Sequence, residues 1–177
     1  YDPSREIYTA EGERIWILGN AGKADDVRAA VECGAEGIGL FRSEFLYMES
    51  GDFPDEEKQY KAYAEAAEIC GERPLTIRTL DIGGDKALPY LDLEKEENPF
   101  LGYRAIRISL DMIPQFKTQI RAILRAGAHG NVRMMFPMIA TIEELVKARK
   151  LVSECIEELE AEGKTFDKEM PVGMMIE

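Results

Sequence analysis

Short apolar runs alternate with longer amphipathic segments along the chain, and this alternation constrains the fold more than any other feature. The intervening segments place their apolar residues at helical spacing, as Ala24, Val27 and Val31 do. Alternation of strand-like and helix-like segments is typical of a parallel sheet covered by helices. The runs that predict strands are 15–18, 37–41, 75–77, 132–137 and 172–176.

Helix boundaries are marked by recognisable capping residues. Pro54 is followed by three carboxylates, which favour the positive end of a helix dipole, and Asn98 with Pro99 predicts another helix start. Thr141 and Glu144 have the spacing of a capping box. Gly34 is expected to end the first helix as a C-terminal cap.

The length leaves two α/β architectures open. A complete (β/α)₈ barrel takes roughly 250 residues, so a chain of 177 has room for five or six units and shows five strands. An incomplete barrel needs further strands, whereas a doubly wound sheet does not. The chain lacks a starting Met and stops at Glu177 inside an apolar run, so we expect a piece of a longer protein.

The chain is strongly acidic, with a net charge of −12 and a pI of about 4.7. Nucleic acids and anionic membranes reward clustered positive charge, so both are excluded as main partners. No apolar run is long enough for a membrane span, and residues 1–13 do not resemble a leader peptide. The scattered cysteines Cys33, Cys70 and Cys155 predict buried, reduced thiols in a cytoplasmic protein.

Polar side chains follow four of the five predicted strands: Asn20, Arg42, Arg78 and Glu177, whereas the fourth strand ends at Pro137. Ligands of parallel α/β folds bind at this carboxyl edge. Two arginines there can grip a phosphate or carboxylate, and a nearby carboxylate can hold Mg²⁺. A single arginine after a strand is more often a surface charge, so the residues alone indicate an anion site without fixing its chemistry.

Other motifs in the sequence give little indication of function. Residues 19–23 lack the spacing of a Walker A loop, and the glycines at 34, 37 and 39 do not form a dinucleotide fingerprint. The single histidine, His129, lies in a small turn, where we expect it to cap the preceding helix.

Several longer segments resemble one family. GIGLFRSEFL at 37–46, RTLDIGGDK at 78–86 and ENPFLGYRAIR at 97–107 are similar to Enzyme I, the phosphoenolpyruvate–protein phosphotransferase family of the bacterial sugar phosphotransferase system. MFPMI at 135–139 and GMMIE at 173–177 resemble later blocks of the same family. The resemblance extends from about Arg14 to the end of the chain.

This resemblance implies an α/β fold: a parallel (β/α) barrel of the TIM type, incomplete, with about the first five of eight strands. Residues 14–177 would form the N-terminal part of the phosphoenolpyruvate-binding barrel, and residues 1–13 a linker or the end of a preceding domain. By the same analogy Arg42, Arg78 and Arg104 bind the substrate, and Glu177 is a ligand of the cofactor Mg²⁺.

The family passes the phosphoryl group of phosphoenolpyruvate to an enzyme histidine on a separate N-terminal domain, and then to the carrier protein HPr. That histidine, the second metal ligand and the proton-donating cysteine fall outside this chain, so His129 and the three cysteines inherit none of these roles. The resemblance therefore implies no catalytic residue within the fragment, which is expected to be inactive alone. A cytoplasmic homodimer or other self-association is also implied.

Three alternatives remain. The barrel of pyruvate phosphate dikinase or phosphoenolpyruvate synthase is homologous, although the run at 79–86 favours Enzyme I. A Mg²⁺-dependent carbon–carbon lyase could use the same strand-end arginine and glutamate. A non-catalytic assembly fragment would leave an open strand edge and self-associate.

Overall fold

The protein is described by a computed structural model that covers residues 6–83, 88, 90, 91 and 102–176. Its fold is α/β, with one parallel sheet of five strands in the order β3-β4-β5-β6-β7. The order in space therefore equals the order along the chain. The strands are β3 (Gly19–Ala21), β4 (Ile38–Arg42), β5 (Leu75–Arg78), β6 (Val132–Ile139) and β7 (Val172–Ile176).

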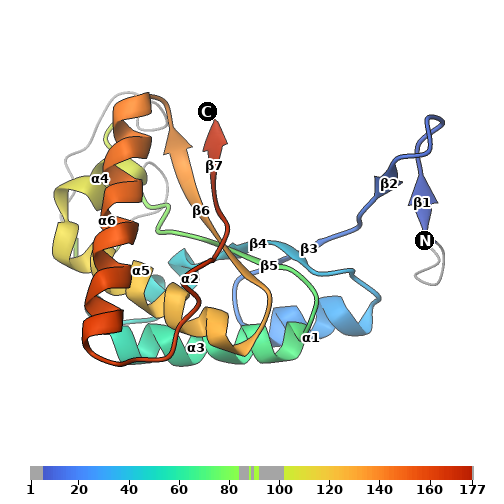
Figure 1. Cartoon of the computed structure of the whole chain (residues 1–177), viewed down its shortest axis with the longest axis horizontal. Coiled ribbons are helices and arrows are strands. Elements are labelled where there is room, and N and C mark those ends of the chain that lie inside the picture. The colour runs from blue at the N-terminus through green and yellow to red at the C-terminus, as the bar shows by residue number, and fades with distance from the viewer. Residues whose placement is uncertain (1–5, 84–87, 89, 92–101, 177) are drawn as a thin grey trace.

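The longer helices line one face of this sheet (Figure 1). Along that face α1 packs on α3, α3 on α5, and α5 on α6. Two short strands, β1 (Ile7–Tyr8) and β2 (Arg14–Ile15), form an antiparallel hairpin that projects away from the helices. The helices are α1 (Ala24–Glu32), α2 (Glu44–Met48), α3 (Glu56–Cys70), α4 (Ile106–Asp111), α5 (Ile113–Ala126), the 3₁₀ turn η1 (Gly127–His129) and α6 (Ile142–Ala161).

The main core fills the space between sheet and helices. Side chains alternate between the two faces of a strand, and in β6 Val132, Met134 and Phe136 are buried against the helices. The opposite face of the sheet is more open. Arg133 is exposed there. In β7, Met174 and Ile176 are in register with Phe136 and Ile139 and so belong to the helix side, where they are 39% and 81% exposed.

The expected helix starts on described residues are confirmed. The Asp55 side chain accepts a hydrogen bond from the Lys58 amide at the start of α3. Thr141 and Glu144 form the predicted capping box at the start of α6. The helix start expected at Asn98 and Pro99 lies outside the described residues.

The prediction for the first strand was wrong in position. Instead of spanning 15–18, β3 begins at Gly19, and the chain before it leaves the sheet, with Trp16 and Leu18 54% and 40% exposed. The amide of Ile17 donates to the carboxylate of Glu36, and its carbonyl accepts from the amide of Glu36, two residues before β4 begins. Apolar content alone therefore misplaced the strand, because these side chains lie on the open face.

Two further expectations need correction. Strand β6 continues through Pro137 to Ile139, with an irregular register and a positive φ of 56° at Met138. Cys70 and Cys155 are buried and Cys33 is exposed; all three are free thiols. Burial raises the pKa of Cys70 to about 11 and that of Cys155 to about 12, so both resist ionisation.

His129 does not cap helix α5 with its side chain. Its Nε2 lies 2.7 Å from the Tyr60 hydroxyl, and its Nδ1 lies 2.9 Å from a carboxylate oxygen of Glu68. Both partners belong to α3, so the histidine joins the η1 turn to that helix.

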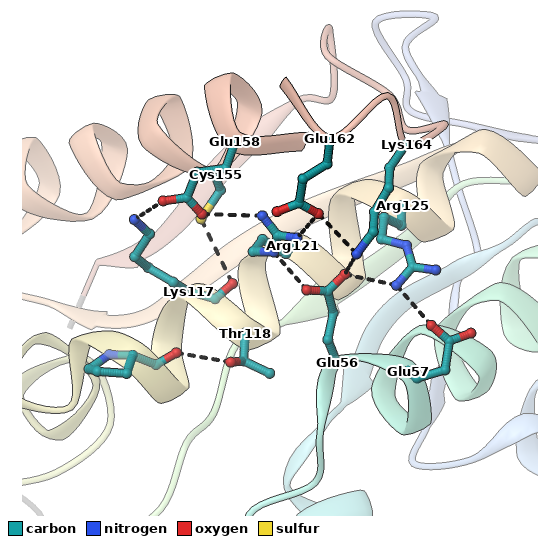
Figure 2. A network of polar contacts seen from close by, with 11 residues as sticks. Glu56, Glu57, Lys117, Thr118, Arg121, Arg125, Cys155, Glu158, Glu162 and Lys164 are labelled. Atoms are coloured by element: carbon teal, nitrogen blue, oxygen red, sulfur yellow. Dashed lines mark hydrogen bonds and ion pairs between the residues drawn. The ribbon is translucent and has the colours of Figure 1, made fainter. Parts of the chain in front are cut away.

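A network of charged side chains ties α3, α5 and α6 together (Figure 2). Arg121 of α5 contacts Glu56 at 2.6 Å and Glu162, which follows α6, at 2.7 Å. Burial raises the pKa of Glu56, but hydrogen bonds from Arg121 and other cations outweigh it and hold the pKa below its ordinary value. Further members are Glu57, Lys117, Arg125, Glu154, Glu158 and Lys164.

Within the described residues, no helix is long and apolar enough to cross a membrane.

Candidate anion-binding site

Two arginines stand side by side at the carboxyl edge of the sheet. Arg42 is the last residue of β4 and Arg78 the last residue of β5, and the two are direct partners in the parallel register. Their juxtaposition, expected from the strand-end positions, is confirmed. Neighbouring guanidinium groups repel each other unless anions lie close by, so the surroundings of this pair decide what it can do.

Arg78 lies between two carboxylates. Its Nη2 donates to Oε1 of Glu44 at 2.9 Å, and its Nη1 donates to Oδ2 of Asp81 at 2.9 Å. Glu44 opens helix α2 directly after β4, and Asp81 follows β5 by three residues. All three side chains are almost completely buried, and buried charges of this kind persist only when paired.

The second oxygen of Asp81 reaches a further arginine. Nη2 of Arg104 donates to Oδ1 of Asp81 at 3.0 Å, and Arg104 is only 7% exposed. Asp81 therefore bridges Arg78 and Arg104, which are 26 residues apart in the sequence. Arg104, expected near the site from the family resemblance, is thus joined to Arg78 through one carboxylate.

Arg42 adds a third positive charge at this edge. Its guanidinium carbon lies 4.7 Å from the centre of the Phe45 ring, a cation–π contact that fixes its direction. Within the described part of the chain, Nε of Arg42 and Nε of Arg78 are buried and have no hydrogen-bond partner. Buried donors without a protein partner are uncommon, and a bound water, ion or ligand can supply the missing acceptor.

Among the residues that the structure describes, the charges of this cluster leave a surplus. Arg42, Arg78 and Arg104 stand against Glu44 and Asp81, three positive groups against two negative groups. The site therefore favours an anion, in a protein whose total charge is −12.

Close backbone contacts hold Arg104 in place. Gly83 has φ of +119°, and a Cβ on it would lie 2.4 Å from Cβ of Arg104. The amide of Ala105 donates to the carbonyl of Ile82 at 2.9 Å, and Ala105 itself adopts a positive φ of 50°. A strained residue next to a buried arginine is typical of a functional site, because the surrounding structure must enforce it.

A buried hydrogen-bond network supports the strand ends from behind. Ser43 Oγ donates to the carbonyl of Arg78 at 2.7 Å, and Gln119 Nε2 of α5 donates to Ser43 Oγ at 3.0 Å. Oε1 of Gln119 accepts from the Leu80 amide at 2.9 Å, and its Nε2 also donates to the Tyr63 hydroxyl at 3.1 Å. Burial raises the pKa of Tyr63, so its hydroxyl stays protonated. The network thus links the segments after β4 and β5 to the helix layer.

Sequence reasoning found the arginines but missed most of their partners. No role was assigned to Glu44, Asp81, Ser43 or Gln119. For Glu44 and Asp81 a signal was present, since both are acidic residues within three positions of a strand-end arginine. Gln119 gave no such signal, because it lies on a helix 39 residues beyond Leu80.

The other two predicted site residues have different outcomes. Asn20 lies inside β3 rather than after its end; it is exposed and in register with Leu40. Glu177, the expected metal ligand, lies outside the described residues. Among the residues that are described, no group of three or more His, Cys, Asp and Glu side chains is arranged to hold a metal ion.

A second place with two arginines lies near the amino ends of the strands. A groove of about 560 Å³ there contains Arg73 and Arg133, but also Glu36 and Glu72. Two positive and two negative groups leave no surplus charge. The strand-end cluster is therefore the better anion site.

The chain is similar to proteins of one family. The family described as PEP-utilising enzyme, PEP-binding domain, matches residues 2–177. The phosphoenolpyruvate-protein phosphotransferase of Priestia megaterium is 47% identical over 174 residues, which cover 98% of this chain and 30% of the relative. That of Geobacillus stearothermophilus is 50% identical over 96% of this chain and 29% of the relative. That of Mycoplasma capricolum is 52% identical over 91% of this chain and 28% of the relative.

The chain spans about 30% of the length of these curated relatives. The family match covers nearly every residue, including both strand-end arginines and the segment that carries Arg104. The chain belongs to the PEP-binding domain family of the PEP-utilising enzymes.

Proposed function

We propose that residues 14–177 form the N-terminal part of a phosphoenolpyruvate-binding (β/α)₈ barrel, and that residues 1–13 are a linker or the end of a preceding domain. The strand order supports the barrel. In a doubly wound sheet the order reverses at a switch point, whereas the order β3-β4-β5-β6-β7 contains no reversal. Helices on one face and an open opposite face also fit a barrel wall (Figure 1).

The site is proposed to bind phosphoenolpyruvate through Arg42, Arg78 and Arg104. The observation that carries this proposal is the in-register pair Arg42 and Arg78, each with a buried Nε that lacks a partner among the described residues. Phosphoryl and carboxylate oxygens are suitable acceptors for these donors. The surplus of one positive charge suits a multiply charged anion that arrives with a cation.

Mg²⁺ is the proposed companion cation, with Glu177 as one ligand. Met175 of β7 lies 3.7 Å from Nη1 of Arg78, so the strand that leads to residue 177 reaches the arginine cluster. A carboxylate at such a place is a donor that Mg²⁺ accepts, together with substrate oxygens. When bound, the metal would neutralise charge on the phosphoryl oxygens.

In the parent enzyme this site would serve phosphoryl transfer from phosphoenolpyruvate to an enzyme histidine and then to HPr, in the sugar phosphotransferase system of the cytoplasm. The relatives' name, phosphoenolpyruvate-protein phosphotransferase, supports the transfer of a phosphoryl group from phosphoenolpyruvate to a protein. The arginines of this chain would hold and neutralise the transferring group, the main contribution a protein makes to such a reaction.

The 177-residue chain alone is proposed to bind phosphoenolpyruvate but not to transfer its phosphoryl group. His129 is engaged with Tyr60 and Glu68, and Cys70 and Cys155 are buried thiols, which supports structural roles for them. Isothermal titration with phosphoenolpyruvate and Mg²⁺ tests the binding: saturable binding that is lost in Arg78→Ala is expected. Pyruvate formation by the chain alone would contradict the proposal.

A further inference from the structure

We propose that Asp81 is a positioning residue, which sets Arg78 and Arg104 as one rigid pair for anion capture. This inference rests on the proposed function of the two arginines and adds the group that orients them. Asp81 uses both carboxylate oxygens, Oδ2 toward Arg78 at 2.9 Å and Oδ1 toward Arg104 at 3.0 Å. It is itself only 6% exposed, so solvent does not compete for these bonds.

The alternative role for Asp81 is that of a competitor. A carboxylate beside two arginines occupies donors that a phosphate could use, and its negative charge repels an anionic ligand. By this reasoning, loss of the charge would strengthen ligand binding. The two roles therefore predict changes of opposite sign for the same substitution.

Geometry favours the positioning role. Arg78 retains a buried Nε beyond its contacts with Glu44 and Asp81, so the carboxylates do not use up its donors. Arg104 approaches along a tight backbone path, with Gly83 against its Cβ, and Asp81 lies two residues before Gly83. The segment 81–83 thus contacts Arg104 through both its side chain and its backbone.

Without the Asp81 charge, Arg78 would keep its bond to Glu44, but the carboxylate that joins it to Arg104 would be lost, and the repulsion between the two guanidinium groups would increase. The loss of order then outweighs the gain in positive potential, because a guanidinium binds phosphate well only when its planar fork is held in direction. We therefore expect Asp81→Asn to weaken binding of phosphoenolpyruvate with Mg²⁺ at least tenfold, about 1.4 kcal/mol. Equal or tighter binding would overturn the inference.

The matched control is Glu72→Gln. Glu72 is exposed near the amino end of β5, at the opposite end of the strand, and its substitution changes the net charge by the same amount. It should leave affinity within about twofold, a shift of about 0.4 kcal/mol.

A double-mutant cycle separates positioning from an independent effect on the fold. If Asp81 acts through Arg104, Asp81→Asn should reduce the affinity for phosphoenolpyruvate much less in an Arg104→Gln background than in the unchanged chain. Equal costs in both backgrounds would overturn the inference. Should Asp81→Asn fail to fold, Asp81→Glu, which keeps the charge but displaces it, replaces it in the cycle with the same expectation.

A readout without ligand keeps the two proposals distinguishable. In ¹⁵N spectra of the arginine side chains, Asp81→Asn should shift and broaden the resonances of both Arg78 and Arg104, while Glu72→Gln should leave them unchanged. Failure of the unchanged chain to bind phosphoenolpyruvate would refute the proposed function, and the spectra would then decide the positioning of the pair. Unchanged resonances of Arg104 in Asp81→Asn would overturn the inference.

Discussion

Replacement of Gln119 by leucine tests whether the buried network behind the site stabilises the strand ends. The substitution keeps the side chain's approximate volume and removes its three hydrogen bonds, to the Leu80 amide, Ser43 Oγ and the Tyr63 hydroxyl. Two of these partners keep another bond, since Ser43 donates to the Arg78 carbonyl and Tyr63 donates to Gln59. The Leu80 amide loses its acceptor.

The expected loss follows from these contacts. A buried donor left without a partner costs about 1–3 kcal/mol, and each of the other bonds contributes about 0.5–1.5 kcal/mol. Burial of the leucine offsets part of this sum, so we expect Gln119→Leu to lower the free energy of unfolding by about 2–4 kcal/mol. Urea denaturation measures this loss, and the slope m should stay unchanged because the same surface is exposed on unfolding.

The control is Gln115→Leu, the same substitution one turn earlier on α5 at a half-buried position. It should change stability by less than about 1 kcal/mol, as most substitutions away from buried networks do. Hydrogen exchange provides the local check: the Leu80 amide should exchange faster in Gln119→Leu only. Equal stability of the two variants would refute the reasoning.

Three further predictions follow from other parts of the structure. Gly83→Ala should unfold more easily and lose phosphoenolpyruvate binding, because the added Cβ would lie 2.4 Å from Cβ of Arg104 and the φ of +119° is strained for alanine. The control is Gly51→Ala, whose added Cβ meets nothing within 4 Å. It should change neither stability nor binding in the same denaturation and titration assays. Hydrogen bonds from Arg121 and then Lys164 lower the pKa of Glu162 to about 2 from 4.5, so its stabilising effect is present above about pH 4.5 and is lost as the pH falls toward 2. Acid denaturation should show this loss, and Arg121→Gln should flatten the profile; an identical profile would argue against the network. The open face of the sheet should cause self-association, seen as a rise in mass between two concentrations in light scattering, and a monomer at both would contradict an uncovered barrel wall.

Much of the fold could be predicted from the sequence because periodicity reports local burial. The runs at 37–41, 75–77 and 172–176 became β4, β5 and β7 with small changes at their ends. The run at 15–18 failed, because an apolar stretch on the open face looks the same in the sequence as a buried strand. The position of the first strand depends on which residues pair with β4, and in the structure these are Gly19–Ala21.

The site could be predicted only in outline. Parallel strands place their carboxyl ends at one edge, so the proximity of Arg42 and Arg78 follows from the strand assignment. The bridge from Asp81 to Arg104 depends on the path of the chain between them, which periodicity does not determine. The support from Gln119 depends on how α5 packs against the strand ends, and no local pattern encodes that contact.

A crystal structure of the chain with phosphoenolpyruvate and Mg²⁺ is the most direct test of the proposed site. We predict phosphoryl oxygens within hydrogen-bonding distance of the Nε atoms of Arg42 and Arg78, with Asp81 still bridging Arg78 and Arg104. The competing location is the groove at the amino ends of the strands, which contains Arg73 and Arg133. Phosphoenolpyruvate bound there, with the strand-end arginines unchanged and free of ligand, would contradict the account.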